Sequence, residues 1–213
     1  MKKMIALAAV ALLAAPAAFA QEANDAEKWQ GAYVGVKGAY NFGELSGKDK
    51  KSKSEDFSIN GAGFSFYAGF NTALSEKLIL GIESSVGYGF AKKEVGTVAV
   101  DTTRVSFKRK LDVDAKARLG FAMDRILPFV SAGVGLSQQE LEMEDADSKS
   151  THSKSVLFYS AGIGADYKLT DNIAVRGEYD YRHYSETKFK TIGDDVTATG
   201  HDHRISLGAA YSF

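Results

Sequence analysis

The sequence predicts an all-β fold, an eight-stranded antiparallel up-and-down transmembrane β-barrel with short turns at one end and four long loops at the other. Apolar and polar residues alternate in eight segments of roughly ten residues, a pattern typical of strands with one face in lipid and one in a polar lumen. The connections between these segments alternate between long and short. The chain has 21 glycines and only 2 prolines, which suits strands that must keep their backbone donors.

Each segment has one apolar face and one polar or small-residue face. In the seventh segment, for example, Ile173 and Val175 lie on one face, while Arg176 and Glu178 lie on the other. A soluble barrel would have to bury that charged face in its core at a heavy desolvation cost, which favours the transmembrane barrel over a soluble lipocalin-like binder. The eight segments are 32–42, 64–71, 78–90, 111–121, 130–137, 157–167, 173–182 and 204–213.

The connection lengths predict the orientation, because outer-membrane barrels have short periplasmic turns and longer extracellular loops. The short connections are 72–77, 123–126 and 168–172. The long ones are 43–58, 91–104, 140–154 and 185–200. Aromatic residues are expected at both membrane interfaces. The outer group comprises Tyr40, Phe42, Tyr88, Phe90 and Tyr181, and the inner group Phe70, Phe121, Tyr167, Tyr211 and Phe213.

Residues 1–20 have the pattern of a secretory signal peptide, with two lysines, an apolar stretch and a small-residue exit that places cleavage between Ala20 and Gln21. Residues 21–28 are then a short periplasmic segment and residues 29–213 the barrel domain. Without the two signal lysines, 24 of the 26 basic residues remain against 27 acidic ones, which excludes a strongly basic nucleic-acid binder. The chain has no cysteine, and therefore no disulfide framework and no thiolate metal site.

The last eight residues carry a resemblance of their own. Ser206, Gly208, Tyr211 and the final Phe213 resemble the C-terminal signal of Gram-negative outer-membrane β-barrels, which the assembly machinery reads. The stretches Trp-Gln-Gly-Ala-Tyr-Val-Gly-Val from residue 29, Ala-Lys-Ala-Arg-Leu-Gly-Phe from 115 and Val-Arg-Gly-Glu-Tyr-Asp-Tyr from 175 resemble the small outer-membrane β-barrel domain family of OmpX/OmpA-type proteins and related surface antigens. The resemblance covers nearly the whole mature chain and implies location in the outer membrane, but it specifies no ligand.

An eight-stranded barrel is just wide enough for its own side chains to fill. We therefore expect the charges of the polar face to pair inside it, because unpaired buried charge is costly. A narrow ion or proton pathway is the alternative, and a large diffusion channel is excluded by the strand number. The predicted lumen network comprises Lys37, Glu83, Asp114, Lys116, Arg118, Arg176, Glu178, Asp180, Arg182 and Arg204.

The sequence favours a monomeric, non-enzymatic surface protein, without cofactor or metal, that supports envelope integrity and acts through its loops as an antigen or adhesin. Expected partners are outer-membrane lipid or lipopolysaccharide, the assembly machinery and a host or environmental ligand. One enzymatic alternative rests on His183 and Ser185, which resemble the His-x-Ser pair of lipid A deacylases, although Glu186 stands where that family has Asn and no acid is evident to orient His183. A narrow small-solute pore is the other alternative. His201, Asp202 and His203 look like a metal-binding cluster. However, only His201 and His203 share a face of the strand, and no third metal ligand is evident there.

Overall fold

The computed structural model describes residues 25–49, 52–90, 92–97, 104–144, 149–190 and 195–213. The predicted signal peptide and its cleavage position lie outside these residues. Among the described residues, no helix has the length and hydropathy needed to cross a membrane. The elements are η1 (Glu27–Trp29), β1 (Gly31–Asp49), β2 (Ser52–Ala73), β3 (Leu78–Gly89), β4 (Lys92–Thr97), β5 (Arg104–Phe121), β6 (Ile126–Glu144), β7 (Lys149–Lys168), β8 (Ile173–Lys190) and β9 (Asp195–Ser212).

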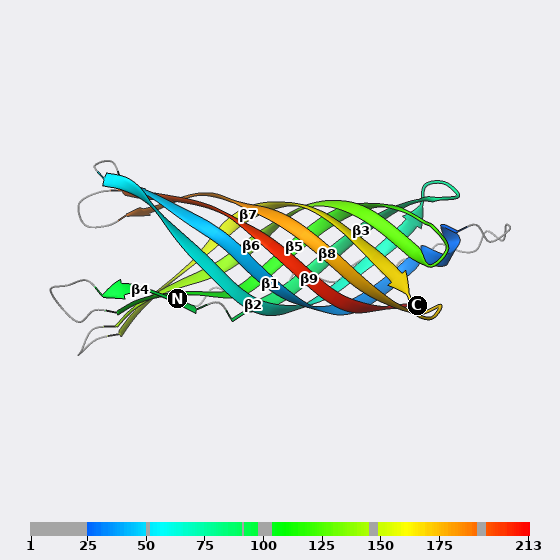
Figure 1. Cartoon of the computed structure of the whole chain (residues 1–213), viewed down its shortest axis with the longest axis horizontal. Helices are drawn as coiled ribbons and strands as arrows, with labels where there is room; N and C mark the ends of the chain where they lie inside the picture. The colour runs from blue at the N-terminus through cyan, green and yellow to red at the C-terminus, as the bar shows by residue number, and fades with distance from the viewer. Residues whose placement is uncertain (1–24, 50–51, 91, 98–103, 145–148, 191–194) are drawn as a thin grey trace, which may run out of the picture.

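The strands form one closed antiparallel barrel (Figure 1). Their order is β3-β2-β1-β9-β8-β7-β6-β5-β4, and the additional pairing of β3 with β5 closes the sheet. The short β4 also pairs with β5, on the stretch that follows the β3 partners, so β3 and β4 are successive parts of one barrel position. The predicted eight-stranded up-and-down barrel is therefore confirmed.

Burial follows the predicted alternation. In β5, every even-numbered residue from Asp112 to Gly120 is buried and every odd-numbered residue from Leu111 to Phe121 is exposed. β3 repeats this pattern, with Glu83 and Ser85 buried between the exposed Ile82, Ser84 and Val86. The exposed apolar side chains form the outer wall and the buried polar ones fill the lumen. This is the reverse of a soluble barrel, as expected for strands that face lipid.

The long connections are largely β-hairpin rather than loop. Of the range 43–58, only residues 50 and 51 fall outside β1 and β2, and the pairing runs from Phe42 opposite Asn60 to Asp49 opposite Ser52. Similarly, β6 and β7 stay paired as far as Glu144 opposite Lys149. The expected loop bounds were too wide, because the backbone pairing of the strands continues past the segments in which apolar and polar residues alternate.

The short-turn end is closed by the segment before β1, which lies at the same end of the barrel as the C-terminus (Figure 1). Trp29 of η1 packs in a buried apolar cluster that includes Ile79 and Leu127. Its indole Nε1 donates to the Asp124 carbonyl at 3.1 Å. Gly31 then adopts a φ of 111°, a left-handed conformation that suits glycine and turns the chain into β1.

Two salt bridges on the surface of the short-turn end hold the segment before β1 in place. Lys28 Nζ lies 3.1 Å from Asp25 Oδ1 and 2.7 Å from Asp124 Oδ1. The hydrogen bond from Lys28 holds the pKa of Asp25 below its ordinary value. The hydrogen bond to Asp124, followed by that to Asp25, raises the pKa of Lys28 above its ordinary value. All three side chains are largely in solvent, so these pairs position the segment more than they stabilise the barrel.

Candidate functional site

The lumen is the largest assembly of functional groups in the described part of the chain. All ten residues of the predicted network are buried and point inward. The inward direction follows from strand parity, since each belongs to the face opposite the exposed apolar residues. The residues lie in two groups along the barrel axis, which we call the midplane cluster (Lys37, Glu83, Asp114, Lys116, Arg118, Asp166, Arg176, Glu178 and Asp180) and the outer cluster (Asn41, Asp112, Arg182, Asp202 and Arg204).

At the base of the midplane cluster, two arginines share two carboxylates. Arg118 contacts Glu83 at 3.3 Å and Asp166 at 2.7 Å. Arg176 also contacts Glu83, and its Nε donates to Asp166 Oδ1 at 2.6 Å. The Tyr33 hydroxyl donates to Glu83 at 2.9 Å and accepts from Arg118 at 2.8 Å. These contacts join β1, β3, β5, β7 and β8, so the layer crosses the lumen.

The remainder of the midplane cluster continues from Glu83 toward the outer end. Lys37 lies 3.7 Å from Glu83 and 3.0 Å from Glu178. Lys116 binds the same Glu178 at 3.0 Å and Asp180 at 2.7 Å. The side chains of these residues are at most 4% exposed, so solvent screens their interactions little.

In the outer cluster, Arg182 is the central residue. It makes a two-point bond to Asp202, with Nε–Oδ1 at 2.7 Å and Nη2–Oδ2 at 2.8 Å. Its Nη1 donates to Asp112 at 2.9 Å. Arg204 donates to the same Asp112 carboxylate at 2.8 Å and to the Asn41 amide oxygen at 2.8 Å. Two arginines thus balance two aspartates, each in charge-assisted bonds of short length.

Aromatic rings separate the charged side chains from the wall. The Arg176 guanidinium lies 4.6 Å from the centroid of the Tyr67 ring, and that of Arg118 lies 3.8 Å from the Phe129 ring. Tyr67 lies against Gly35 of β1, where an added Cβ would overlap its ring. The glycine is needed at this close approach because no larger residue leaves room for the ring.

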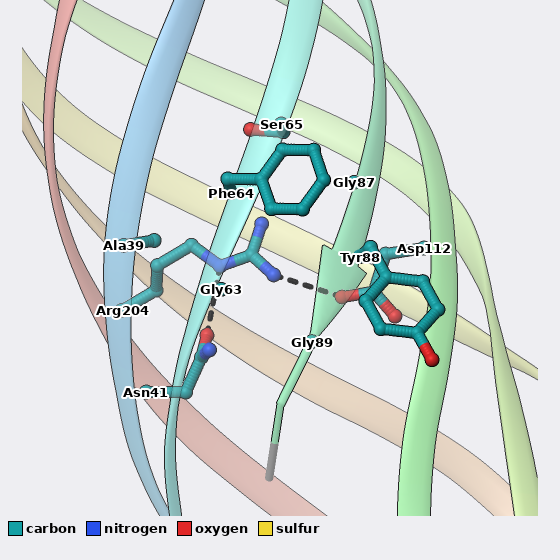
Figure 2. Close-up of a pocket in the computed structure, with 10 residues that line it drawn as sticks. All are labelled: Ala39, Asn41, Gly63, Phe64, Ser65, Gly87, Tyr88, Gly89, Asp112 and Arg204. Carbon is teal, nitrogen blue, oxygen red and sulfur yellow. Dashed lines mark hydrogen bonds and ion pairs between the residues drawn. The ribbon is translucent and has the colours of Figure 1, made fainter.

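Little space remains between these side chains. Figure 2 shows the cavity at the outer end, where the Arg204 side chain lies between Asn41 and Asp112. Gly63, Gly87 and Gly89 also line this cavity, and the space available to the centre of a water molecule is about 10 Å³, which admits about one water molecule. The cavity therefore gives no room for a solute.

The predicted lumen network omitted four members of these clusters, Asn41, Asp112, Asp166 and Asp202. Strand parity could have identified all four, because each lies on the polar face of its strand, and Asp112 and Asp202 lie two residues from Asp114 and Arg204. Asp202 was interpreted only as part of the His201–His203 stretch. The structure separates that stretch: Asp202 points inward to Arg182, whereas the histidines lie on the outer face. Among the described residues, no group of three or more His, Cys, Asp or Glu is arranged to hold a metal ion.

The residues of the enzymatic alternative lie on the outer part of β8. His183 is exposed, and its cross-strand neighbours are Tyr159 of β7 and His201 of β9. Neither neighbour is a carboxylate that could orient the imidazole as a general base. The register between β8 and β9 is irregular directly after Tyr184. The described direct cross-strand neighbours of His183 therefore supply no orienting acid.

Aromatic side chains gather on the outer wall near both ends. At the outer end, Phe64, Tyr88 and Phe90 lie within 6.5 Å of one another, measured between ring centroids. At the other end, Tyr211 and Phe213 lie edge to face at 5.3 Å. Phe64 was not among the residues expected at the outer interface. Its position beside Tyr88 follows from the direct pairing of these residues between β2 and β3.

A closed eight-stranded barrel with an apolar outer wall, two aromatic bands and an ion-paired lumen defines the class of transmembrane outer-membrane β-barrels. The chain belongs to the outer membrane protein β-barrel domain family, which it matches over residues 5–213. It is a protein of the outer membrane.

Curated relatives agree with this assignment. The chain is 29% identical over 185 residues to the 25 kDa outer-membrane immunogenic protein of Brucella canis, covering 87% of this chain and 79% of that one. It is 26% identical to a 22 kDa outer membrane protein of Rhizobium leguminosarum bv. viciae, with 91% and 83% covered.

Solved structures with similarity to the chain include two surface barrels. Neisserial surface protein A is 16% identical with a TM-score of 0.49, covering 85% of this chain and 97% of that one. The attachment invasion locus protein Ail of Yersinia pestis is 14% identical with a TM-score of 0.45, covering 86% and 99%.

Proposed function

We propose that this outer-membrane protein is a non-enzymatic surface protein whose sealed barrel carries long hairpins into the medium, where they support envelope integrity and act as antigen or adhesin. The observation that carries the proposal is the continuation of the strands beyond the outer aromatic band. On β1, pairing with β2 continues for seven residues after Phe42, to Asp49. Such paired extensions have a hydrogen-bonded backbone frame, which suits recognition better than an unstructured loop does.

The names of the relatives support a surface role. Those from Brucella are described as outer-membrane immunogenic proteins. The same role for this chain would use the four hairpins, since they are the part of the barrel that extends from the outer end.

The lumen supports a closed barrel over a narrow pore. The Arg118–Asp166–Arg176 layer crosses the lumen, and Trp29 closes the short-turn end beneath it. The absence of a carboxylate next to His183 across the strands likewise favours a non-enzymatic protein over a lipid A esterase. We further propose that the barrel is monomeric and works without a cofactor.

The assembly signal remains part of the proposal. The last residues form the half of the closing seam at the short-turn end, where Val34 pairs with Tyr211 and the Phe213 amide donates to the Ala32 carbonyl at 3.1 Å. Ser206 and Gly208 face the lumen side, while Tyr211 and Phe213 face outward. Reading of this strand by the assembly machinery would therefore act on the seam between the first and last strands of the barrel.

The hairpin proposal is tested by trimming the hairpins while keeping the barrel. Residues 45–57 and 141–152 are each replaced by a two-residue turn, in a strain that lacks the native protein. We expect the trimmed protein to keep its heat-dependent migration on SDS gels and to restore resistance to bile salts and vancomycin. It should lose recognition by antiserum raised against whole cells and adhesion to epithelial monolayers. Unchanged recognition and adhesion would contradict a role for the hairpins.

A further inference from the structure

Three of the four histidines of the chain lie together on the outer wall. His183 of β8 is paired directly with His201 of β9, and His203 follows two residues later on the same face. Residues paired in this way have Cβ atoms about 5 Å apart. The imidazoles of His201 and His203 lie 5.9 Å apart, measured between ring centroids. The chain thus places three titratable rings in one patch.

Tyrosines and a phenylalanine hold these rings in place. The Tyr179 hydroxyl and His203 Nδ1 are hydrogen-bonded at 2.6 Å. The His203 ring also stacks on Phe42 of β1, with centroids 5.9 Å apart and an angle of 18°. Tyr181 contacts both His201 and His203, at 6.0 and 5.4 Å. Because the bond to Tyr179 uses Nδ1, Nε2 is the nitrogen through which His203 can bind a further partner.

The patch lies at the outer edge of the apolar band. On β9 the outward residues from Ile205 to Phe213 are exposed and contain no charge. These eight residue steps span about 20 Å along the membrane normal for a strand tilted by about 40°. The outward-facing apolar band of such barrels is about 25 Å tall. His203 and His201, the next outward residues, are therefore at the level where lipid headgroups begin.

We propose that the imidazoles of His183, His201 and His203 bind a phosphate group on an outer-leaflet lipid headgroup when they are protonated. Imidazole is the side chain whose charge ordinarily changes between pH 5 and 8, and charged donors form strong hydrogen bonds to phosphate oxygens. The aromatic rings around the patch offer an apolar surface to the adjoining part of the lipid. This binding role concerns the barrel wall and is independent of the hairpins.

The other titratable groups around the patch are few. Tyr159 of β7 lies opposite His183, Tyr179 and Tyr181 flank the patch on β8, and Tyr40 of β1 lies opposite Ile205. By register, Glu44 of β1 lies opposite His201. Phenols stay neutral over the pH range in which imidazoles titrate.

The test measures lipid retention by the folded full-length barrel. The protein is equilibrated in vesicles that contain diphosphoryl lipid A or its dephosphorylated form, extracted in mild detergent at pH 5.5 or pH 8, and the lipid A per barrel is counted by mass spectrometry. We expect roughly fivefold more diphosphoryl lipid A at pH 5.5 than at pH 8, the change for one well-placed ion pair. Dephosphorylated lipid A should show no such difference.

Variants separate the patch from other histidine effects. The triple variant H183Q/H201Q/H203Q should lose the pH dependence, whereas H152Q, which changes the fourth histidine, should retain it. Heat-dependent gel migration verifies folding of each variant. Equal retention of the two lipid forms by the wild-type barrel would overturn the proposal even if the triple variant failed to fold. A pH dependence that persists in the folded triple variant would overturn it as well.

Discussion

Arg182 and Asp202 face each other across β8 and β9 and form a two-point ion pair in which both side chains are at most 4% exposed. The same arginine reaches Asp112 on β5. One guanidinium thus connects the closing region of the sheet with a more distant strand, and the outer cluster depends on it. The planar, five-donor guanidinium suits this position because it can bind two carboxylates at once.

Substitution of Arg182 by methionine should cost stability. The variant R182M leaves Asp112 and Asp202 buried with one arginine between them, and removal of one partner from a buried pair typically costs about 3–5 kcal/mol. We expect this loss in the free energy of unfolding, measured by urea denaturation in lipid vesicles.

The matched control removes the orphaned carboxylate as well. The double variant R182M/D202N keeps Arg204 paired with Asp112 and should recover a substantial part of the lost free energy of unfolding, because replacement of a buried ion pair by neutral groups is much less costly than breaking it. A loss below about 1 kcal/mol in R182M, the size of an exposed pair, would mean that the outer cluster is open to water.

Truncation of Trp29 tests the closure of the short-turn end. Trp29 is 6% exposed within the apolar cluster at this end. The variant W29A should lower the free energy of unfolding by about 3–5 kcal/mol, as for other buried aromatic residues. L74A replaces an exposed apolar residue at the same end. This control should change the free energy of unfolding by about 0.5 kcal/mol or less. Similar effects of the two variants would show that η1 does not pack into the barrel.

The pH dependence of the N-terminal segment follows from Asp25 and Lys28. The lowered pKa of Asp25 means that its contribution is present above the ordinary value of 3.8 and is lost as the pH falls through the folded value. The raised pKa of Lys28 means that its contribution is present below 10.5 and is lost as the pH rises through the folded value. The segment should therefore keep its pairs through neutral pH and lose them only in strong acid or base.

Tryptophan fluorescence can follow the loss of these pairs directly, because Trp29 is the single tryptophan and lies next to Lys28. Its emission should be constant between about pH 5 and pH 9 and change outside that range. K28M should remove the alkaline transition. A transition near pH 6.5 in the wild-type protein would indicate control by a histidine instead and would contradict this account.

Deletion of Phe213 should impair assembly more than loss of another outward apolar residue does. Phe213 is 75% exposed and Leu207 72%, so the two differ little in the area they offer to lipid. Only the deletion removes the terminal amide that bonds to Ala32 and the proposed assembly signal. We expect a severalfold smaller fraction of heat-modifiable protein for the deletion, and nearly normal assembly for L207A. Equal defects would leave no special role for the terminus.

Much of the fold could be predicted from the sequence, because a strand that separates lipid from a polar lumen must alternate along its length. Arg176 and Glu178 alternate with Val175 and Tyr179, and the structure buries the first pair and exposes the second. In the structure β9 pairs with β1, as the predicted closed barrel requires. In a membrane barrel, the alternation of apolar and polar residues therefore predicts which face of each strand is buried more directly than in a soluble protein.

Other features of the structure could not be predicted from the alternation of side chains in the sequence. The hairpin extensions beyond Phe42 are held by backbone bonds, and the long apolar face of the membrane-crossing strands does not continue into them. Pairing inside the lumen joins residues far apart in the chain, as when Lys37 binds Glu178, and parity predicts only that both point inward. The three-histidine patch depends on register, since His183 meets His201 only in the observed alignment of β8 with β9.

The central claim is that this outer-membrane barrel is sealed by its own side chains and closed by Trp29, and acts through its surface. Single-channel recording of the folded protein in a planar lipid bilayer tests it most directly, with a large trimeric porin as positive control. We expect no stable conductance steps above those of the protein-free bilayer. Reproducible steps of one size, present in the wild-type barrel and altered in R182M, would contradict the sealed lumen and favour a narrow pore.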